Sequence, residues 1–139
     1  MATSRLNVRV SGPLFDGRAD RAVYDFLDAV KKDVAETGRD WIKLEAEGFD
    51  KSGRGGTGRA SAGVVIKGSK FNDQIISGGI REGEYAWPWL EGVSKRNETT
   101  RFKGYRTFRK NRLKLRKRWP EIAQHILPKY LPLMGGRVE

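Results

Sequence analysis

The residues of this chain that could do chemistry are a few carboxylates, one histidine and a dense run of lysines and arginines. Glu82, Glu84 and Glu91 lie close together in sequence, and metal-dependent nucleases hold divalent ions with such carboxylates. No fourth acidic partner is evident, and acids near turns are ordinarily solvated. His125 is the only histidine, and a lone histidine on a helix is usually a surface or core residue. We therefore predict that the protein is not an enzyme and has no catalytic residue, metal ion or cofactor.

Other common site motifs are excluded by composition or by context. The chain has no cysteine, which rules out disulfides, thiolate metal sites and thiol nucleophiles. The segment GRGGTG at 53–58 matches the dinucleotide fingerprint, but that motif needs a strand before it and a helix after it. Here a helix precedes and a strand-like segment follows, so nucleotide binding is rejected. No apolar run approaches the roughly 18 residues of a membrane span, and we expect a soluble protein without a membrane partner.

The strongest chemical signal is positive charge gathered in the last third of the chain. The net charge is +11, and residues 93–139 alone contain 14 basic and 3 acidic side chains. Such a segment attracts phosphates through counterion release, pairs with an acidic partner, or is simply a solvated face. The aromatic residues among the charges could stack on bases, but their helical spacing favours core packing. The residues we select as contacts for a partner or DNA are Arg54, Arg59, Arg101, Lys103, Arg106, Arg109, Lys110 and Arg112.

A long helix is expected to position the rest of the molecule. Apolar residues recur at spacings of three and four from Val23 to Leu44, which predicts a helix over 18–46 with a possible break at Gly38. Unbroken, this helix would be about 40 Å long. Residues 47–62 are rich in glycine and predict a surface loop, or an arm that becomes ordered only against a partner or nucleic acid.

A small antiparallel sheet should follow. The segments AGVVIKGS and DQIISGGI predict two strands joined by the turn-like SKFN, within a hairpin region at 62–92. At its end, AWPWLEG predicts a strand or turn, because Pro88 forbids a central strand and biases Trp87 toward an extended backbone. In an extended chain Trp87 and Trp89 would share one face and anchor packing, either inside the subunit or between subunits. Glu91 is expected to pair with a basic group, and Gly92 to permit a turn.

The basic segment completes the expected domain. Residues 93–104 predict a basic loop, and 105–131 predict C-terminal helices at about 106–118 and 120–131, broken or kinked by Pro120. The alternation in RLKLRKR leaves a strand as an alternative there. Residues 132–139 would form a tail. We predict one α+β domain over 1–139, with a long N-terminal helix packed on a small antiparallel sheet and a C-terminal helical segment.

The order of short motifs resembles a known family. The motif residues are Thr57, Gly58 and Arg59 before the hairpin, then Tyr85, Ala86, Glu91 and Gly92 after it, followed by an aromatic and basic stretch with Tyr105 and Phe108. This order resembles the tail-completion or head–tail joining (neck, minor tail) proteins of long-tailed bacteriophages. The chain departs from that pattern in LEGVS, which lacks the family's phenylalanine and threonine, and in GYRTFRK, which lacks its prolines.

The resemblance implies a structural virion protein of the phage neck, assembled in the host cytoplasm. Such a protein forms or completes a homo-oligomeric ring, with six-fold symmetry favoured and twelve-fold possible, and its partners are the neighbouring connector and tail proteins. Contact with genomic DNA in the channel is possible, but a channel lined with this much positive charge would hold the DNA. We therefore expect most of the basic segment to face acidic proteins. The alternative is a small basic nucleic-acid-binding protein that uses residues 95–118, and a distant third is a nuclease.

Overall fold

The fold is α+β and mostly helical, as predicted. The computed structural model describes residue 12 and residues 16–51, 59–68, 74–78 and 86–135. Its elements in chain order are α1 (Arg18–Lys51), α2 (Arg59–Ala62), β1 (Val65–Gly68), β2 (Gln74–Ser77), α3 (Ala86–Glu91), α4 (Lys95–Thr99), α5 (Thr107–Tyr130) and the 3-10 turn η1 (Leu131–Met134).

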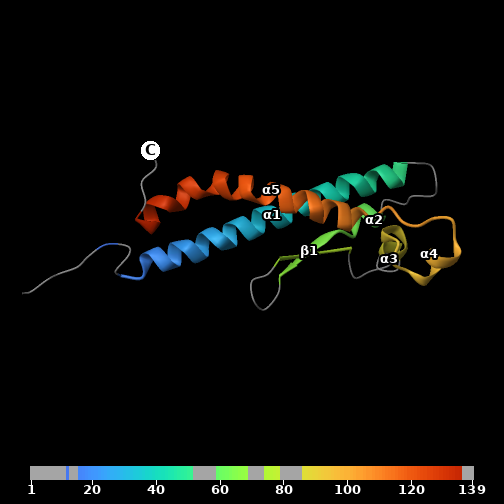
Figure 1. Cartoon of the computed structure of the whole chain (residues 1–139), viewed down its shortest axis with the longest axis horizontal. Helices are drawn as coiled ribbons and strands as arrows, with labels where there is room; N and C mark the ends of the chain where they lie inside the picture. The colour runs from blue at the N-terminus through green and yellow to red at the C-terminus, as the bar shows by residue number, and fades with distance from the viewer. Residues whose placement is uncertain (1–11, 13–15, 52–58, 69–73, 79–85, 136–139) are drawn as a thin grey trace, which may run out of the picture.

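Two long helices form the body of the molecule. Figure 1 shows α1 and α5 side by side and running in opposite directions, with the β-hairpin and the short helices α3 and α4 on one side of the pair. The antiparallel pairing places Phe26 against Tyr130, with ring centres 6.0 Å apart, at one end. At the other end Glu45 lies against the first turns of α5. The result is an elongated molecule.

The helix α1 is longer than the sequence indicated and has no break. It continues to Lys51, so residues 47–51 belong to the helix and not to the predicted glycine-rich loop. Gly38 does not interrupt it because this glycine is buried where three elements meet. A Cβ atom there would lie 2.5 Å from Leu115 Cδ1 of α5 and 2.7 Å from Ile76 Cδ1 of β2. The glycine therefore permits close approach of α5 and the hairpin to α1.

The buried face of α1 is built from small residues. The buried hydrophobic residues on this helix are Ala19, Ala22, Val30, Ala35, Ile42 and Ala46. Three residues of the predicted stripe have exposed side chains, Val23 (41% exposed), Leu27 (45%) and Leu44 (69%), whereas Val30 of the same stripe is buried. Their spacing correctly indicated a helix, but α5 packs closely on the neighbouring small-residue face.

The hairpin confirms the predicted strands. β1 and β2 pair antiparallel, with Val65 opposite Ser77 and Gly68 opposite Gln74. The turn predicted at 69–72 lies outside the described residues. Part of the predicted loop or arm is helical, because residues 59–62 form the short helix α2, which packs on α1. The core cluster joins these elements through Ile42, Ala46, Val64 and Trp87.

The segment AWPWLEG is a helix, and its prediction as a strand or turn is wrong. Residues 86–91 form α3, with Pro88 near its start. Proline is tolerated there because the first backbone N–H groups of a helix have no partner within the helix. The fixed φ of Pro88 thus suits a helix start as well as it opposes a strand.

The predicted basic loop also contains a helix. Residues 95–99 form α4, which is capped by Ser94 through a capping box with Asn97. Asn97 is buried and also donates hydrogen bonds to the carbonyl oxygens of Trp89 (3.0 Å) and Phe102 (3.2 Å). One amide side chain therefore ties α3, α4 and the following loop together.

The two predicted C-terminal helices are one. α5 runs from Thr107 to Tyr130 with Pro120 and Pro128 inside it, and RLKLRKR belongs to this helix and not to a strand. Both prolines are exposed, so the carbonyl groups that lose an N–H partner can be hydrated. The predicted tail at 132–139 begins instead within η1, and its residues beyond 135 lie outside the described part of the chain.

A candidate docking groove

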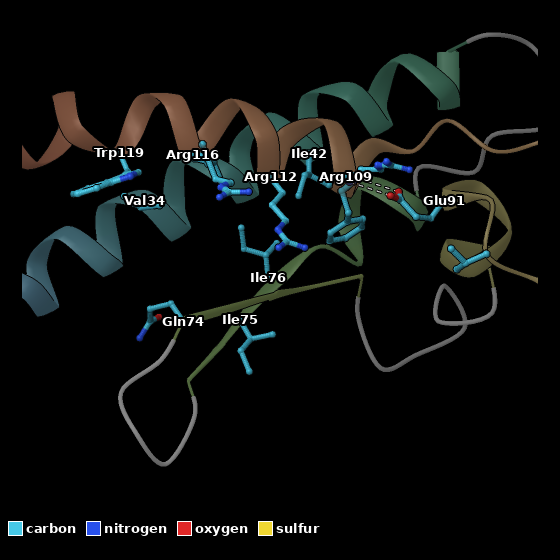
Figure 2. Close-up of a pocket in the computed structure, with 13 residues that line it drawn as sticks. Val34, Ile42, Gln74, Ile75, Ile76, Glu91, Arg109, Arg112, Arg116 and Trp119 are labelled. Atoms are coloured by element: carbon cyan, nitrogen blue, oxygen red, sulfur yellow. Dashed lines mark hydrogen bonds between the residues drawn. The ribbon is translucent and has the colours of Figure 1, made fainter.

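An open groove lies between α5 and the hairpin. Its volume is about 820 Å³. Figure 2 shows the two helices on one side of it and the strands on the other. The apolar lining includes Ile42, Ile76, Phe108 and Leu115, while Ile75 (52% exposed) and Val93 (76% exposed) lie toward its edges. The groove is thus an apolar surface open to solvent.

Three arginines lie on the α5 side of this groove. Arg109, Arg112 and Arg116 are spaced by three and four residues, which places them on one side of the helix. All three are exposed, and their guanidinium groups make no hydrogen bond or ion pair with another described residue. Trp119, half exposed, continues the same side by one turn. The groove therefore combines an apolar surface with positive charge that no other described residue pairs.

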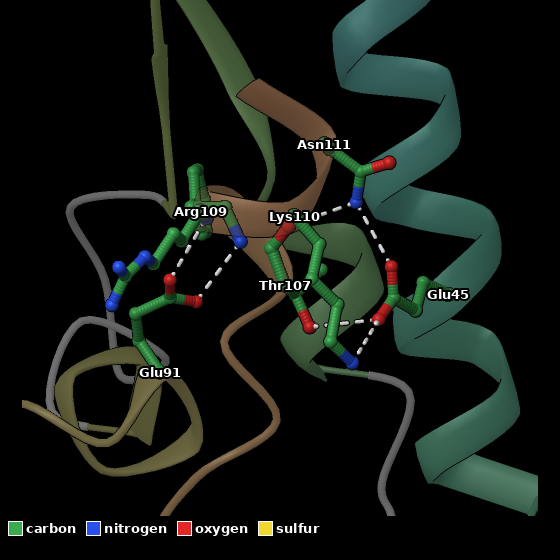
Figure 3. A network of polar contacts seen from close by, with 7 residues as sticks. Glu45, Glu91, Thr107, Arg109, Lys110 and Asn111 are labelled. Atoms are coloured by element: carbon green, nitrogen blue, oxygen red, sulfur yellow. Dashed lines mark hydrogen bonds and ion pairs between the residues drawn. The ribbon is translucent and has the colours of Figure 1, made fainter. Parts of the chain in front are cut away.

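Glu91 is the acidic residue among those that line the groove, and its carboxylate has a structural role. Its Oε2 accepts a hydrogen bond from the backbone N–H of Phe108 (2.9 Å), and its Oε1 accepts one from that of Arg109 (3.0 Å). Figure 3 shows these two bonds. They cap α5, whose own N-cap residue, Arg106, has a left-handed backbone (φ 54°) and makes no capping bond. Glu91 is therefore a helix cap held from α3, and in place of the predicted pairing its carboxylate binds backbone N–H groups and forms no ion pair with a described basic side chain.

The turn after α3 confirms the role expected of Gly92. Its φ is +92°, and a Cβ atom there would collide with the backbone carbonyl oxygen of Lys103. Close by, the N–H of Tyr105 donates to the carbonyl of Leu90 over 2.6 Å. The chain that enters α5 is thus packed directly on the end of α3, which brings Glu91 to the first turn of α5.

The two tryptophans of α3 pack within the chain, against different residues. Trp87 is buried, donates its Nε1–H to the carbonyl of Ala60 (3.2 Å) and meets Phe108 edge-on, with ring centres 4.9 Å apart. Trp89 packs on Phe102, with ring centres 4.6 Å apart, and beneath the guanidinium of Arg96. They do not share a face, because residues two apart in a helix point in widely different directions. Both tryptophans therefore pack inside the chain, and the prediction that they share one face of an extended segment is wrong.

A second polar cluster joins α1 to α5. Glu45 accepts a hydrogen bond from Asn111 Nδ2 (2.9 Å), is 3.4 Å from the Thr107 hydroxyl and forms an ion pair with Lys110 at 3.7 Å. Figure 3 shows these contacts on the side of α5 away from Glu91. Thr107 and Asn111 are buried. This network supports the helix pairing and takes Lys110 out of the set of unpaired basic residues.

Only some of the residues predicted to contact a partner or DNA line the groove. Arg109 and Arg112 lie in the groove, and Lys103 is tied to the backbone carbonyl of Asn97 (2.8 Å). Arg101 and Arg106 are exposed outside the groove lining. Of the remaining predicted site residues, Arg54, Thr57, Gly58 and Tyr85 lie outside the described residues, as do Glu82, Glu84 and the side chains of Arg59 and Ala86.

Sequence reasoning placed Arg109 and Arg116 on one basic side of a helix, but it missed Trp119 and the hairpin residues as parts of the same surface. The spacing of Arg109, Arg112, Arg116 and Trp119 is a helical stripe and could have been read from the sequence. The contribution of β2 could not, because it depends on tertiary packing.

The described residues form no metal centre. Within them, no three histidine or acidic side chains come together in a way that could hold a metal ion. His125 is exposed and lines a shallow pocket of about 400 Å³ between α1 and α5 with Asp33 and Glu36. None of the helices in the described part of the chain has the length and apolar character needed to cross a membrane.

Comparisons with known proteins do not assign a family. Protein-family models, curated proteins and solved structures all give no match to the chain.

Proposed function

We propose that this protein is a structural subunit of the neck of a long-tailed bacteriophage, which forms or completes a ring joining the head connector to the tail. The motif resemblance suggests this role. Two of its residues, Glu91 and Gly92, join α3 to the start of α5 beside the groove. The function would be adhesion to neighbouring subunits, without catalysis.

The single observation that carries the proposal is the apolar groove lined by three arginines that form no ion pair with the rest of the described chain. An exposed apolar surface with a charged edge is typical of a protein–protein interface, whose centre is apolar and whose rim is polar. The arginines supply charge and hydrogen-bond donors that a partner carboxylate can satisfy. The groove has no convergent set of acids, hydroxyls or histidines suited to catalysis among its lining residues.

The small core supports the same proposal. The described residues contain eight buried hydrophobic side chains, of which four are alanines. Large side chains such as Tyr24, Leu113 and Trp119 are half or more exposed. A chain with so little burial of its own gains stability when assembly covers such surfaces.

The test uses the purified protein together with particles of the phage that encodes it. Electron microscopy should show a ring of subunits at the head–tail junction, and Arg112→Glu/Arg116→Glu should reduce incorporation into particles. The control Lys114→Glu/Lys117→Glu makes the same charge change at exposed positions of α5 that do not line the groove. Absence of the wild-type protein from particles would refute the neck role.

A second candidate is nucleic-acid binding by residues 95–118. The exposed Lys114 and Lys117, which make no ion pair with described residues, favour it. This function predicts tight binding to duplex DNA at low salt that weakens steeply as salt rises. It also predicts that Lys114→Glu/Lys117→Glu impairs DNA binding. This double variant is the control in the test of the neck role, so the two functions predict different results for it.

A further inference from the structure

We propose that the groove receives the first half of α1 from another copy of this chain. The inference rests on the proposed function to the extent that a ring needs contacts between copies. It names the two surfaces that make such a contact. One is the groove with its three arginines, and the other is a stripe on α1 formed by Asp20, Val23, Tyr24, Leu27 and Asp28.

The groove defines the chemistry of its occupant. Its lining is apolar, and Arg109, Arg112 and Arg116 add three positive charges. The carboxylate of Glu91 already accepts two backbone hydrogen bonds, and no other described residue forms a hydrogen bond with these guanidinium groups. A complementary occupant therefore carries apolar side chains flanked by carboxylates. A helix that shows both on one side satisfies this requirement.

The stripe on α1 has this composition. Its residues follow the spacing i, i+3, i+4, i+7 and i+8, which places them on one side of the helix. Val23 is 41% exposed, Leu27 45% and Tyr24 69%. Asp20 and Asp28 are exposed, and their carboxylates make no ion pair with another described residue. The stripe is therefore an uncovered apolar surface with an acid near each end.

The charges of the two surfaces match in length. Asp20 and Asp28 are separated by eight residues, a rise of about 12 Å along α1. Arg109 and Arg116 are separated by seven residues, a rise of about 10 Å along α5. When the two helices lie along one another, both carboxylates can therefore reach arginines while Val23, Tyr24 and Leu27 cover the apolar lining.

The stripe cannot occupy the groove of its own chain. α1 is an unbroken helix from Arg18 to Lys51, and Val34 of the same helix lines the groove. Tyr24, at the centre of the stripe, is held about 15 Å farther along the helix axis from Val34. The groove and the stripe are thus two different surfaces of one rigid element and its partners. Their contact requires a second copy, either head to tail around a ring or by exchange in a two-fold dimer.

A charge-reversal cycle tests this contact. Arg109→Glu/Arg116→Glu and Asp20→Lys/Asp28→Lys each place like charges opposite one another and should weaken self-association at least about tenfold. The chain carrying all four changes should return to within about threefold of the wild type, since opposite charges face one another again. Lys114→Glu/Lys117→Glu is the matched control and should leave self-association unchanged. Sedimentation velocity over a range of concentrations measures each variant, and circular dichroism verifies its fold.

The absence of cysteine allows a second, positional test. A mixture of Tyr24→Cys and Trp119→Cys chains should form a covalent dimer with a short bismaleimide, whereas Tyr24→Cys mixed with Lys114→Cys, on the opposite side of α5, should not. Wild-type protein that stays monomeric at all concentrations, or a four-fold variant as weak as the double variants, would overturn the inference.

These outcomes are distinguishable from failure of the proposed function. Particles that still incorporate the groove variant normally would retain the neck role and reject the groove contact. A wild-type protein that associates through these residues but is absent from particles would retain the contact and reject the neck role.

Discussion

Replacing Glu91 with alanine should destabilise the whole subunit, because this residue caps a helix that begins 16 residues later in the chain. The carboxylate accepts the N–H groups of Phe108 and Arg109 at 2.9 and 3.0 Å. Loss of a helix cap costs about 1–2 kcal/mol, and loss of a negative charge at the positive end of a helix costs about 0.3–1 kcal/mol more. We expect a total of about 2 kcal/mol. For a chain of this length the corresponding decrease in Tm is about 7 °C.

The assay is urea unfolding followed by circular dichroism at 222 nm, which monitors the helices α1 and α5. Glu91→Gln keeps one acceptor oxygen but loses the charge, so its loss should be about half that of Glu91→Ala. Glu98→Ala is the control, because Glu98 is exposed and its carboxylate makes no bond with described residues. Its change should stay within about 0.5 kcal/mol. If Glu91→Ala unfolds at the same urea concentration as Glu98→Ala, the capping argument is refuted.

Three further predictions concern other parts of the fold. Gly104→Ala should lower the free energy of unfolding by at least about 2 kcal/mol, since φ is +86° and a Cβ would collide with the backbone of Gly92; thermal unfolding measures this, and an unchanged Tm would contradict it. Asn111→Ala should lower the free energy of unfolding by about 1–3 kcal/mol, because Glu45 loses a hydrogen-bond donor in a partly buried cluster. A decrease in urea unfolding no greater than that of Glu98→Ala, at an exposed position, would argue against it. The pKa of Asp16 should lie below its ordinary value, chiefly because the carboxylate accepts the backbone N–H two residues on. Its contribution to stability is present above the ordinary pKa and is lost as the pH falls through the lowered value; NMR titration of the carboxyl group checks the direction.

The positions of the helix α1 and of the two strands could be predicted from the sequence better than the side of α1 that is buried. The helix over most of 18–51 and the strands at 65–68 and 74–77 follow from local periodicity, which depends on backbone geometry alone. The buried face of α1 depends on how closely α5 approaches. That approach is possible because Gly38 and alanines such as Ala35 and Ala46 leave room, so the larger Leu27 and Leu44 remain exposed.

The candidate site was less predictable because its contacts join distant segments. Pro88 is compatible with the start of a helix and incompatible with a central strand, and the local sequence alone did not decide between a helix and a turn. The bond from Glu91 to the amide of Phe108 spans 17 residues and is set by the turn at Gly92. Arg109 and Arg112 were selected for their charge. They lie beside an apolar surface because β2 packs next to α5, and the position of β2 depends on tertiary contacts that the local sequence does not reveal.

The pairing of α1 with α5 has a consequence for the order in which the chain folds. Glu45 and Asn111, which join the two helices, are 66 residues apart. Closing a loop of that length costs about 4 kcal/mol of chain entropy. During synthesis, α1 is complete roughly 3–11 seconds before α5 begins to emerge, at ordinary rates of translation. The small-residue face of α1 therefore stays exposed until α5 is synthesised near the end of the chain. In a product truncated before Thr107, α5 is missing and this face stays uncovered.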